Sequence, residues 1–156
     1  MSNAKPAGST DSSATLKTHK DPKPENVTWV SPHLTVSDVD TMAKFYEKAF
    51  KFQIKELMTG EDGSIWHGEL RYKDQLIMLG KAGAYGDMSK TRSPKVTGVE
   101  SPMNLYLYCE DVDQFYKDAI AAGASSLTIP QDLFWGDRMC RLQDPDGYTW
   151  CFATKI

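Results

Sequence analysis

The feature that most constrains the fold is a gapless internal repeat, in which Asp38-Val39-Asp40 returns as Asp111-Val112-Asp113, 73 positions later (38 to 111). Further identities keep this offset: Leu34 with Leu107, Lys44 with Lys117, Ala49 with Ala122, and Gly63 with Gly136. A self-match at a fixed period is typical of one structural unit built more than once. The repeat therefore predicts two modules with the same order of strands and helices.

Each copy opens with an alternating strand, 31–36 or 104–109, and then reaches an aspartate, Asp38 or Asp111, suited to capping a helix. Apolar residues at helical spacing follow both caps, and Gly123 provides a stop after the second helix. Strand-like runs come next at 53–58, 64–72 and 75–80, and in the second copy at 125–129, 138–143 and 149–154. Each copy is thus predicted to be β-α-β-β-β.

The same pattern predicts the domain organisation. Residues 27–81 and 102–156 form the two modules, and residues 82–101, rich in Gly, Ser, Lys and Pro, form the linker. Residues 1–26 are dominated by Ser, Thr, Lys, Pro and Asp. Such a segment buries too little apolar surface to offset its ordering entropy, so we expect a flexible tail.

Alternation assigns the two faces of each opening strand. In the first strand Leu34 and Val36 oppose His33 and Thr35, and in the second Leu105 and Leu107 oppose Asn104, Tyr106 and Tyr108. The helix of each module must cover the apolar face, because its own apolar stripe needs burial. The polar faces are then free, and we expect the two modules to enclose one cup between them.

Composition excludes several classes of protein. The net charge is −3 with both signs mixed, so a nucleic-acid surface is not expected. No apolar run approaches the length of a membrane span, and no secretory signal is visible. Three cysteines without C-x-x-C spacing indicate reduced thiols and a cytoplasmic protein.

Several motifs resemble one family. They are 31–36, Phe45-Tyr46, His67-Gly68-Glu69-Leu70, 77–79, and Trp135-Gly136-Asp137-Arg138 through 144–150. Together they resemble the PhnB-like branch of the glyoxalase/bleomycin-resistance/dioxygenase (vicinal oxygen chelate) superfamily. The resemblance implies an α+β fold, in which two tandem βαβββ modules form a cup-shaped mixed or antiparallel sheet. It also implies a homodimer, with activities that range from glyoxalase and extradiol dioxygenase to pure drug binding.

The resemblance further implies where the metalloenzymes of this superfamily carry their ligands. The matching positions hold Ser31, Met78, Asn104 and Cys151. A divalent catalytic metal prefers His nitrogens and carboxylate oxygens, which these residues do not supply. We therefore expect no metal or other cofactor, and neither glyoxalase nor extradiol dioxygenase activity.

A different set of polar residues lies on the predicted cup face of the first module. His33, His67 and Glu69 could form an iron or zinc set, since two imidazoles and one carboxylate suit those metals. They could instead serve as acid–base groups, or be ordinary cup-lining groups. All three interpretations remain open from the sequence.

The second module supplies the candidate ligand-binding residues: Tyr106, Tyr108, Asn104, Trp135 and Arg138. Trp135 and Arg138 have an alternative role as an aromatic anchor and a salt bridge that fix their loop. Three further assignments are structural: Trp150 in the core with Phe152, a turn at 144–147, and Cys151 as a small apolar side chain rather than a reactive thiol.

These residues favour a protein of the glyoxalase/bleomycin-resistance type that binds an aromatic or cationic organic compound in the cup. Its expected partners are that small molecule and a second copy of the chain. Two alternatives stay open. One is a metal-independent or atypical-metal enzyme of lyase or isomerase type, which uses Glu69 with His67 or His33. The other is a dimeric scaffold with a vestigial cup.

Overall fold

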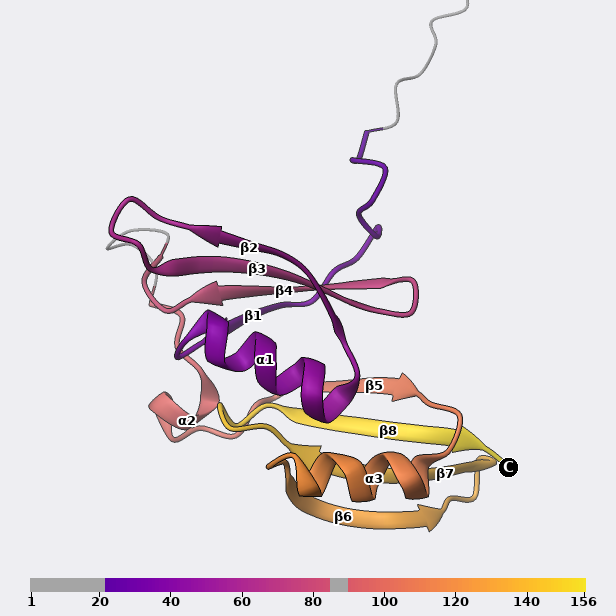
Figure 1. Ribbon diagram of the computed structural model, residues 1–156. Helices are drawn as coiled ribbons and strands as arrows, with labels where there is room; N and C mark the ends of the chain where they lie inside the picture. Colours follow the sequence, from indigo (N-terminus) through magenta and orange to yellow (C-terminus); the bar gives the residue numbers. More distant parts are fainter. Residues whose placement is uncertain (1–21, 85–89) are drawn as a thin grey trace, which may run out of the picture.

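The computed structural model describes residues 22–84 and 90–156 (Figure 1). Most of the predicted tail, residues 1–21, lies outside the described residues, as do residues 85–89 of the predicted linker. Within the described ranges, no helix is long and apolar enough to cross a membrane.

Both modules show the predicted βαβββ order. The first contains β1 (His33–Val36), α1 (Val39–Phe50), β2 (Gln53–Thr59), β3 (Ile65–Tyr72) and β4 (Gln75–Lys81). The second contains β5 (Asn104–Tyr108), α3 (Val112–Ala121), β6 (Ser125–Asp132), β7 (Asp137–Gln143) and β8 (Thr149–Lys155). A short helix, α2 (Pro94–Thr97), lies in the linker.

The two sheets have the same topology. Their strand orders are β1-β4-β3-β2 and β5-β8-β7-β6, with the opening strand parallel to the last strand and the other neighbours antiparallel. The predicted α+β fold class of paired βαβββ modules is therefore confirmed.

Both helices begin at the predicted aspartate caps. The Asp38 carboxylate accepts a 2.8 Å hydrogen bond from the backbone N–H of Thr41, and the Asp111 carboxylate accepts a 3.0 Å bond from that of Gln114. These bonds satisfy amide groups that have no partner inside a helix. The second helix is followed by Gly123 at φ 107°, the left-handed conformation that makes glycine an effective helix stop.

One hydrophobic core serves both modules. Tyr46 and Phe50 of α1 are fully buried, and their rings lie 5.3 and 5.4 Å, centre to centre, from that of Trp150 on β8. Phe50 also lies 4.9 Å from Phe152, so α1 packs against the second module as well as its own sheet. Figure 1 shows α1 between the first sheet and the strands of the second. The prediction that Trp150 and Phe152 are core residues is confirmed.

The shared core buries the apolar face of each sheet. The apolar faces of both sheets contribute to it, through Leu34, Leu79, Leu142 and Trp150 among others. Alternate residues of each strand therefore lie on the side of the sheet away from the core, here called the outer face of the first or second sheet.

The turn between β7 and β8 ties the modules together. The buried Asp144 carboxylate accepts hydrogen bonds from the Tyr46 hydroxyl (2.7 Å), Trp150 Nε1 (2.8 Å) and the backbone N–H groups of Asp146 and Tyr148 (2.9 and 3.0 Å). Burial raises the pKa of Asp144 despite these donors. The Asp146 carboxylate accepts a 2.7 Å bond from the backbone N–H of Ser37. The predicted turn is therefore also an inter-module connection.

Candidate functional site

Three aromatic side chains converge on one carboxylate of the outer face of the second sheet. Oδ2 of Asp137 accepts hydrogen bonds from the hydroxyls of Tyr106 (2.7 Å) and Tyr108 (2.9 Å) and from Nε1 of Trp135 (3.1 Å). Asp137 is 5% exposed, whereas the three aromatic residues are 43 to 54% exposed. We call these four residues the Asp137 cluster. The cluster exposes aromatic side chains to solvent, while the carboxylate beneath them is almost fully buried.

The sheet geometry explains how this cluster forms. Tyr106 and Tyr108 lie on β5, and β8 separates them from Asp137 on β7. Their register partners on β8 are Cys151 and Ala153, whose small side chains leave room for the rings to cross the strand. Trp135 precedes Gly136, whose φ of 92° makes the tight turn into β7.

The hydrogen bonds fix the charge state of the cluster. The bond from Tyr106, with those from Tyr108 and Trp135, lowers the pKa of Asp137. Burial, and then the bond to Asp137, raise the pKa of Tyr106 to about 12. The separate bond from the Tyr108 hydroxyl to Asp137 raises the pKa of Tyr108. At neutral pH the cluster therefore holds one carboxylate and two neutral phenols. Because the phenol protons point at Asp137, the phenol oxygens can only accept hydrogen bonds from a ligand.

Apolar surface adjoins the Asp137 cluster. Met139, Cys151 and Ala153 form a small buried group on the same outer face, with Leu133 packed against it. Phe134, beside Trp135, is 97% exposed, and the two rings meet edge to face at 4.9 Å.

A groove of about 240 Å³ runs beside the tyrosines. It is lined by Tyr106, Leu107 and Tyr108 of β5 and by residues 72–75 of the β3–β4 hairpin. The Tyr72 hydroxyl donates a 2.8 Å hydrogen bond to the backbone carbonyl of Tyr108, which holds the hairpin against β5. The cluster thus combines an aromatic wall with a few placed polar groups, as small-molecule sites commonly do.

The predicted polar set of the first module lies together on the outer face of the first sheet. The rings of His33 and His67 are 5.9 Å apart, and Nε2 of His67 is 3.9 Å from Oε1 of Glu69. His67 is 8% exposed, and its Nδ1 is buried with no hydrogen-bond partner among the described residues. Burial, with the charge of His67, lowers the pKa of His33, so its neutral form is favoured.

The residues do not fit the metal chemistry of the superfamily's metalloenzymes. Residues 22–84 and 90–156 contain no group of three His, Cys, Asp or Glu placed to hold one metal ion, which argues against the set His33, His67 and Glu69. The positions implied by the resemblance hold Ser31 and Met78 in the first module and Asn104 and Cys151 in the second. Their oxygen and sulfur atoms are also poor ligands for a catalytic divalent metal.

Arg138 does not join the predicted ligand-binding residues. Its guanidinium lies on the helix side of β7, where Asp113 of α3 binds it in bidentate fashion (2.7 and 2.9 Å) and Asp132 binds it at 2.7 Å. The alternative role that we gave it, a fixing salt bridge, is the one that the structure shows. Cys151 is 4% exposed and burial raises the pKa of its thiol, as befits a small apolar residue.

Sequence reasoning missed Asp137, the centre of the cluster. The first and last residues of the motif Trp135-Gly136-Asp137-Arg138 were considered as ligand contacts, and Asp137 was given no role. Alternation along β7 was the available signal. It places Asp137, Met139 and Arg141 on the outer face and Arg138, Cys140 and Leu142 toward the helices.

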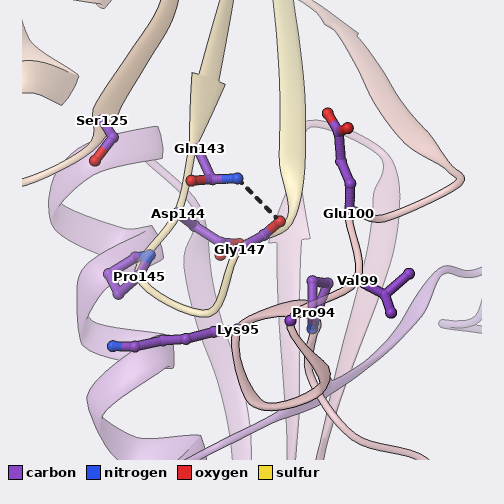
Figure 2. Close-up of a pocket in the computed structure, with 10 residues that line it drawn as sticks. Pro94, Lys95, Val99, Glu100, Ser125, Gln143, Asp144, Pro145 and Gly147 are labelled. Atoms are coloured by element: carbon purple, nitrogen blue, oxygen red, sulfur yellow. Dashed lines mark hydrogen bonds between the residues drawn. The ribbon is translucent and has the colours of Figure 1, made fainter.

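Another groove lies away from the Asp137 cluster. Figure 2 shows this space of about 530 Å³ between the linker around α2 and the β7–β8 turn. Its lining includes Lys95, Glu100, Gln143 and Pro145, and Gln143 donates a 3.4 Å bond to the carbonyl of Gly147. The Asp144 carboxylate beneath it already accepts four hydrogen bonds, so the groove has no free buried acid.

Comparison with known proteins agrees with this fold. The family model described as the Glyoxalase/Bleomycin resistance protein/Dioxygenase superfamily matches residues 27–152. The uncharacterized protein Mb0911c of Mycobacterium bovis is 34% identical over 127 residues, which are 81% of this chain and 83% of that protein. The uncharacterized protein Rv0887c of Mycobacterium tuberculosis is 34% identical over 81% of this chain and 74% of its own length.

Solved structures show the same architecture at lower identity. TioX from Micromonospora sp. ML1 superposes with a TM-score of 0.66 and 22% identity, covering 83% of this chain and 99% of TioX. A glyoxalase/bleomycin resistance protein/dioxygenase family enzyme from Burkholderia phytofirmans PsJN gives 0.63 and 21%, covering 81% of this chain and 97% of its own. At these identities the likeness establishes the fold alone.

Proposed function

The chain belongs to the glyoxalase/bleomycin resistance protein/dioxygenase superfamily, and on that basis we propose that it binds a small organic molecule at the Asp137 cluster. The observation that carries the proposal is the convergence of Tyr106, Tyr108 and Trp135 on Asp137 at an open aromatic surface. The quoted motifs further favour the PhnB-like branch. The unpaired thiols of Cys109, Cys140 and Cys151 favour a reducing compartment such as the cytoplasm.

The chemistry of the cluster selects an aromatic ligand with a cationic, hydrogen-donating group. The exposed rings offer stacking surface and π faces that attract a cation. The phenol oxygens accept hydrogen bonds, and the carboxylate adds a fixed negative charge. An anionic group would meet only acceptors and a like charge at this position.

A second copy of the chain is the partner that we propose to complete the site. The outer face of the second sheet leaves Tyr106, Tyr108 and Trp135 about half exposed, and a second copy would cover them. If the first sheet of one copy covers the second sheet of another, His33, His67 and Glu69 would face the Asp137 cluster. The 97% exposed side chain of Phe134 would then gain a buried environment, which favours such a contact.

One observation favours an enzyme as the second candidate. His67 Nδ1 is buried and unpartnered, and Nε2 of the same ring lies 3.9 Å from Glu69. A buried polar atom without a partner is costly, so a substrate hydrogen bond there would be favourable. Such a substrate would meet a metal-independent acid–base pair, His67 with Glu69.

Calorimetric titration with a matched probe pair tests the binding proposal. Phenethylamine carries the ring and the cation, whereas 2-phenylethanol replaces the ammonium by a hydroxyl. We expect the amine to bind at least about tenfold more tightly, and Asp137→Asn to remove that preference. Tyr116→Phe is the control, because it deletes a tyrosine hydroxyl that bonds Ser126 on the helix side. Equal binding of both probes to the wild type would contradict the role given to Asp137, and no binding would leave the scaffold interpretation.

A further inference from the structure

Arg141 differs from its neighbour Arg138 in having no acidic partner. Among the residues that the structure describes, no carboxylate lies within ion-pair distance of the Arg141 guanidinium. Arg138, three residues earlier on β7, is held by two carboxylates. The difference follows from alternation, because Arg138 points toward α3 while Arg141 lies on the outer face with Met139. A half-buried guanidinium without a counter-charge is a ready acceptor of an anion.

The contacts of Arg141 within the protein leave its positive charge without a negatively charged partner. Its backbone N–H donates a 3.0 Å bond to the Thr128 hydroxyl, which fixes this part of β7. Its side chain lies near Cys151, where its charge favours the thiolate while burial, the larger effect, raises the pKa of that thiol. The five donor groups of the guanidinium are thus largely unused by the protein.

An independent observation on the adjacent strand points to a ligand at the same place. Thr149 is 1% exposed, and its hydroxyl has no hydrogen-bond partner among the described residues. It lies on the same face as Cys151, two residues away on β8, and its register partners are Asn104 and Gln143. By register, Arg141 lies in the row of Cys151 and Tyr106. Thr149 and Asn104 lie in the next row on the same face, farther from Asp137.

We propose that Arg141, with Thr149 and Asn104, forms a carboxylate-binding subsite on the outer face of the second sheet. The guanidinium binds both oxygens of a planar carboxylate, and the hydroxyl and amide supply further donors. Asp137 and Arg141 are four residues apart on β7, or about 13 Å along the strand. Together with the proposed function, on which this inference rests, the subsite defines a ligand class. The ligand is an elongated aromatic molecule with a basic group at one end and a carboxylate at the other.

The subsite alone is tested by a nuclear magnetic resonance titration of the full chain with sodium acetate. The arginine Nε–H signal that Arg141→Lys removes identifies Arg141, and the Arg138 signal serves as the internal control. We expect the Arg141 signal to shift and saturate while the Arg138 signal stays, because its carboxylate partners already occupy it. An Arg141 signal that stays still, or that shifts in parallel with Arg138, would overturn the proposal.

The link to the aromatic ligand is tested by calorimetry with phenylacetate and its neutral isostere phenylacetamide. We expect the acid to bind about tenfold more tightly, the effect of one charge-assisted hydrogen-bonded pair. Arg141→Gln should remove the preference, and Thr149→Val should reduce it severalfold without loss of fold. Lys117→Gln, at an exposed position of α3, makes the same change in net charge and should retain the preference.

These results separate the two proposals. If phenethylamine binds through Asp137 but the acid has no advantage over its amide, the carboxylate subsite is wrong and the proposed function stands. If acetate saturates Arg141 while no aromatic amine binds, the subsite stands and the proposed function is wrong.

Discussion

The Tyr106 hydroxyl donates a 2.7 Å hydrogen bond to Oδ2 of Asp137 from two strands away, across β8. This bond links the edge of the second sheet to the start of β7 and holds one ring of the aromatic surface in place. Its consequences for charge, stability and binding can each be measured.

The first prediction concerns the ionisation of the tyrosines. Burial is the largest cause of the raised pKa of Tyr106, and the bond to Asp137 and its charge add to it. Asp137→Asn removes that charge, so the pKa of Tyr106 should fall below about 12 while burial keeps it above 10. Tyr108, whose pKa the same carboxylate raises, should shift in the same direction. A spectrophotometric titration of wild type and variant measures both. Unchanged phenol titrations would mean that the carboxylate does not hold the two hydroxyls.

The second prediction concerns stability in acid. Because the folded-state pKa of Asp137 is lowered, its contribution is present above the unfolded value near 3.9 and is lost as pH falls through the folded-state pKa. The difference in unfolding free energy between wild type and Asp137→Asn should therefore shrink as pH is lowered from 5 to about 3. Urea unfolding at several pH values measures this difference. A difference that stays constant would contradict the assigned charge state.

The third prediction concerns the inter-module connection. Tyr46→Phe removes one of the four hydrogen bonds to the buried Asp144 carboxylate, and we expect a loss of about 1–3 kcal/mol in unfolding free energy. Burial raises the pKa of Asp144 above its unfolded value. As pH falls, the Asp144 carboxyl therefore takes up a proton at a higher pH in the folded state than in the unfolded state. The cost of the variant should accordingly be smaller in acid, since a neutral carboxyl needs fewer donors. Tyr116→Phe, which removes an exposed hydrogen bond to Ser126, should cost less at neutral pH.

The fourth prediction concerns Gly147. Its φ is 89°, and an added Cβ would lie 3.0 Å from the backbone nitrogen of Lys95 and 3.1 Å from Cβ of Pro94. Gly63 has a similar φ of 78°, but a Cβ there would meet nothing within 4 Å. Gly147→Ala should therefore destabilise the protein more than Gly63→Ala in thermal unfolding. Equal losses would show that backbone conformation alone matters at both positions.

Much of the fold was predictable from the sequence because its signals are local. The caps at Asp38 and Asp111, the alternation along β5 and the repeat itself require no knowledge of distant contacts. The relative placement of the modules does require it. The apolar stripe of α1 shows that Tyr46 and Phe50 are buried, but it does not show that Trp150 of the other module covers them.

The site was predictable only in part for a related reason. Alternation identified Tyr106 and Tyr108 as outer-face residues, and it identified His33, His67 and Glu69 on the first sheet. It did not show that the tyrosine rings cross β8 to reach Asp137, because that depends on the strand order and on the small residues between them. The salt bridge of Arg138 could be offered only as one of two roles, because its partner Asp113 lies on a helix remote in sequence.

The most direct test of the central claim uses two tryptophans of the same chain. The indole N–H of Trp135 donates to Asp137 in the Asp137 cluster, whereas that of Trp150 donates to the buried Asp144. During a titration with phenethylamine, nuclear magnetic resonance can follow both indole signals. Binding at the cluster predicts that the Trp135 signal shifts and saturates while the Trp150 signal stays. A Trp135 signal that does not respond at saturating phenethylamine would contradict the account.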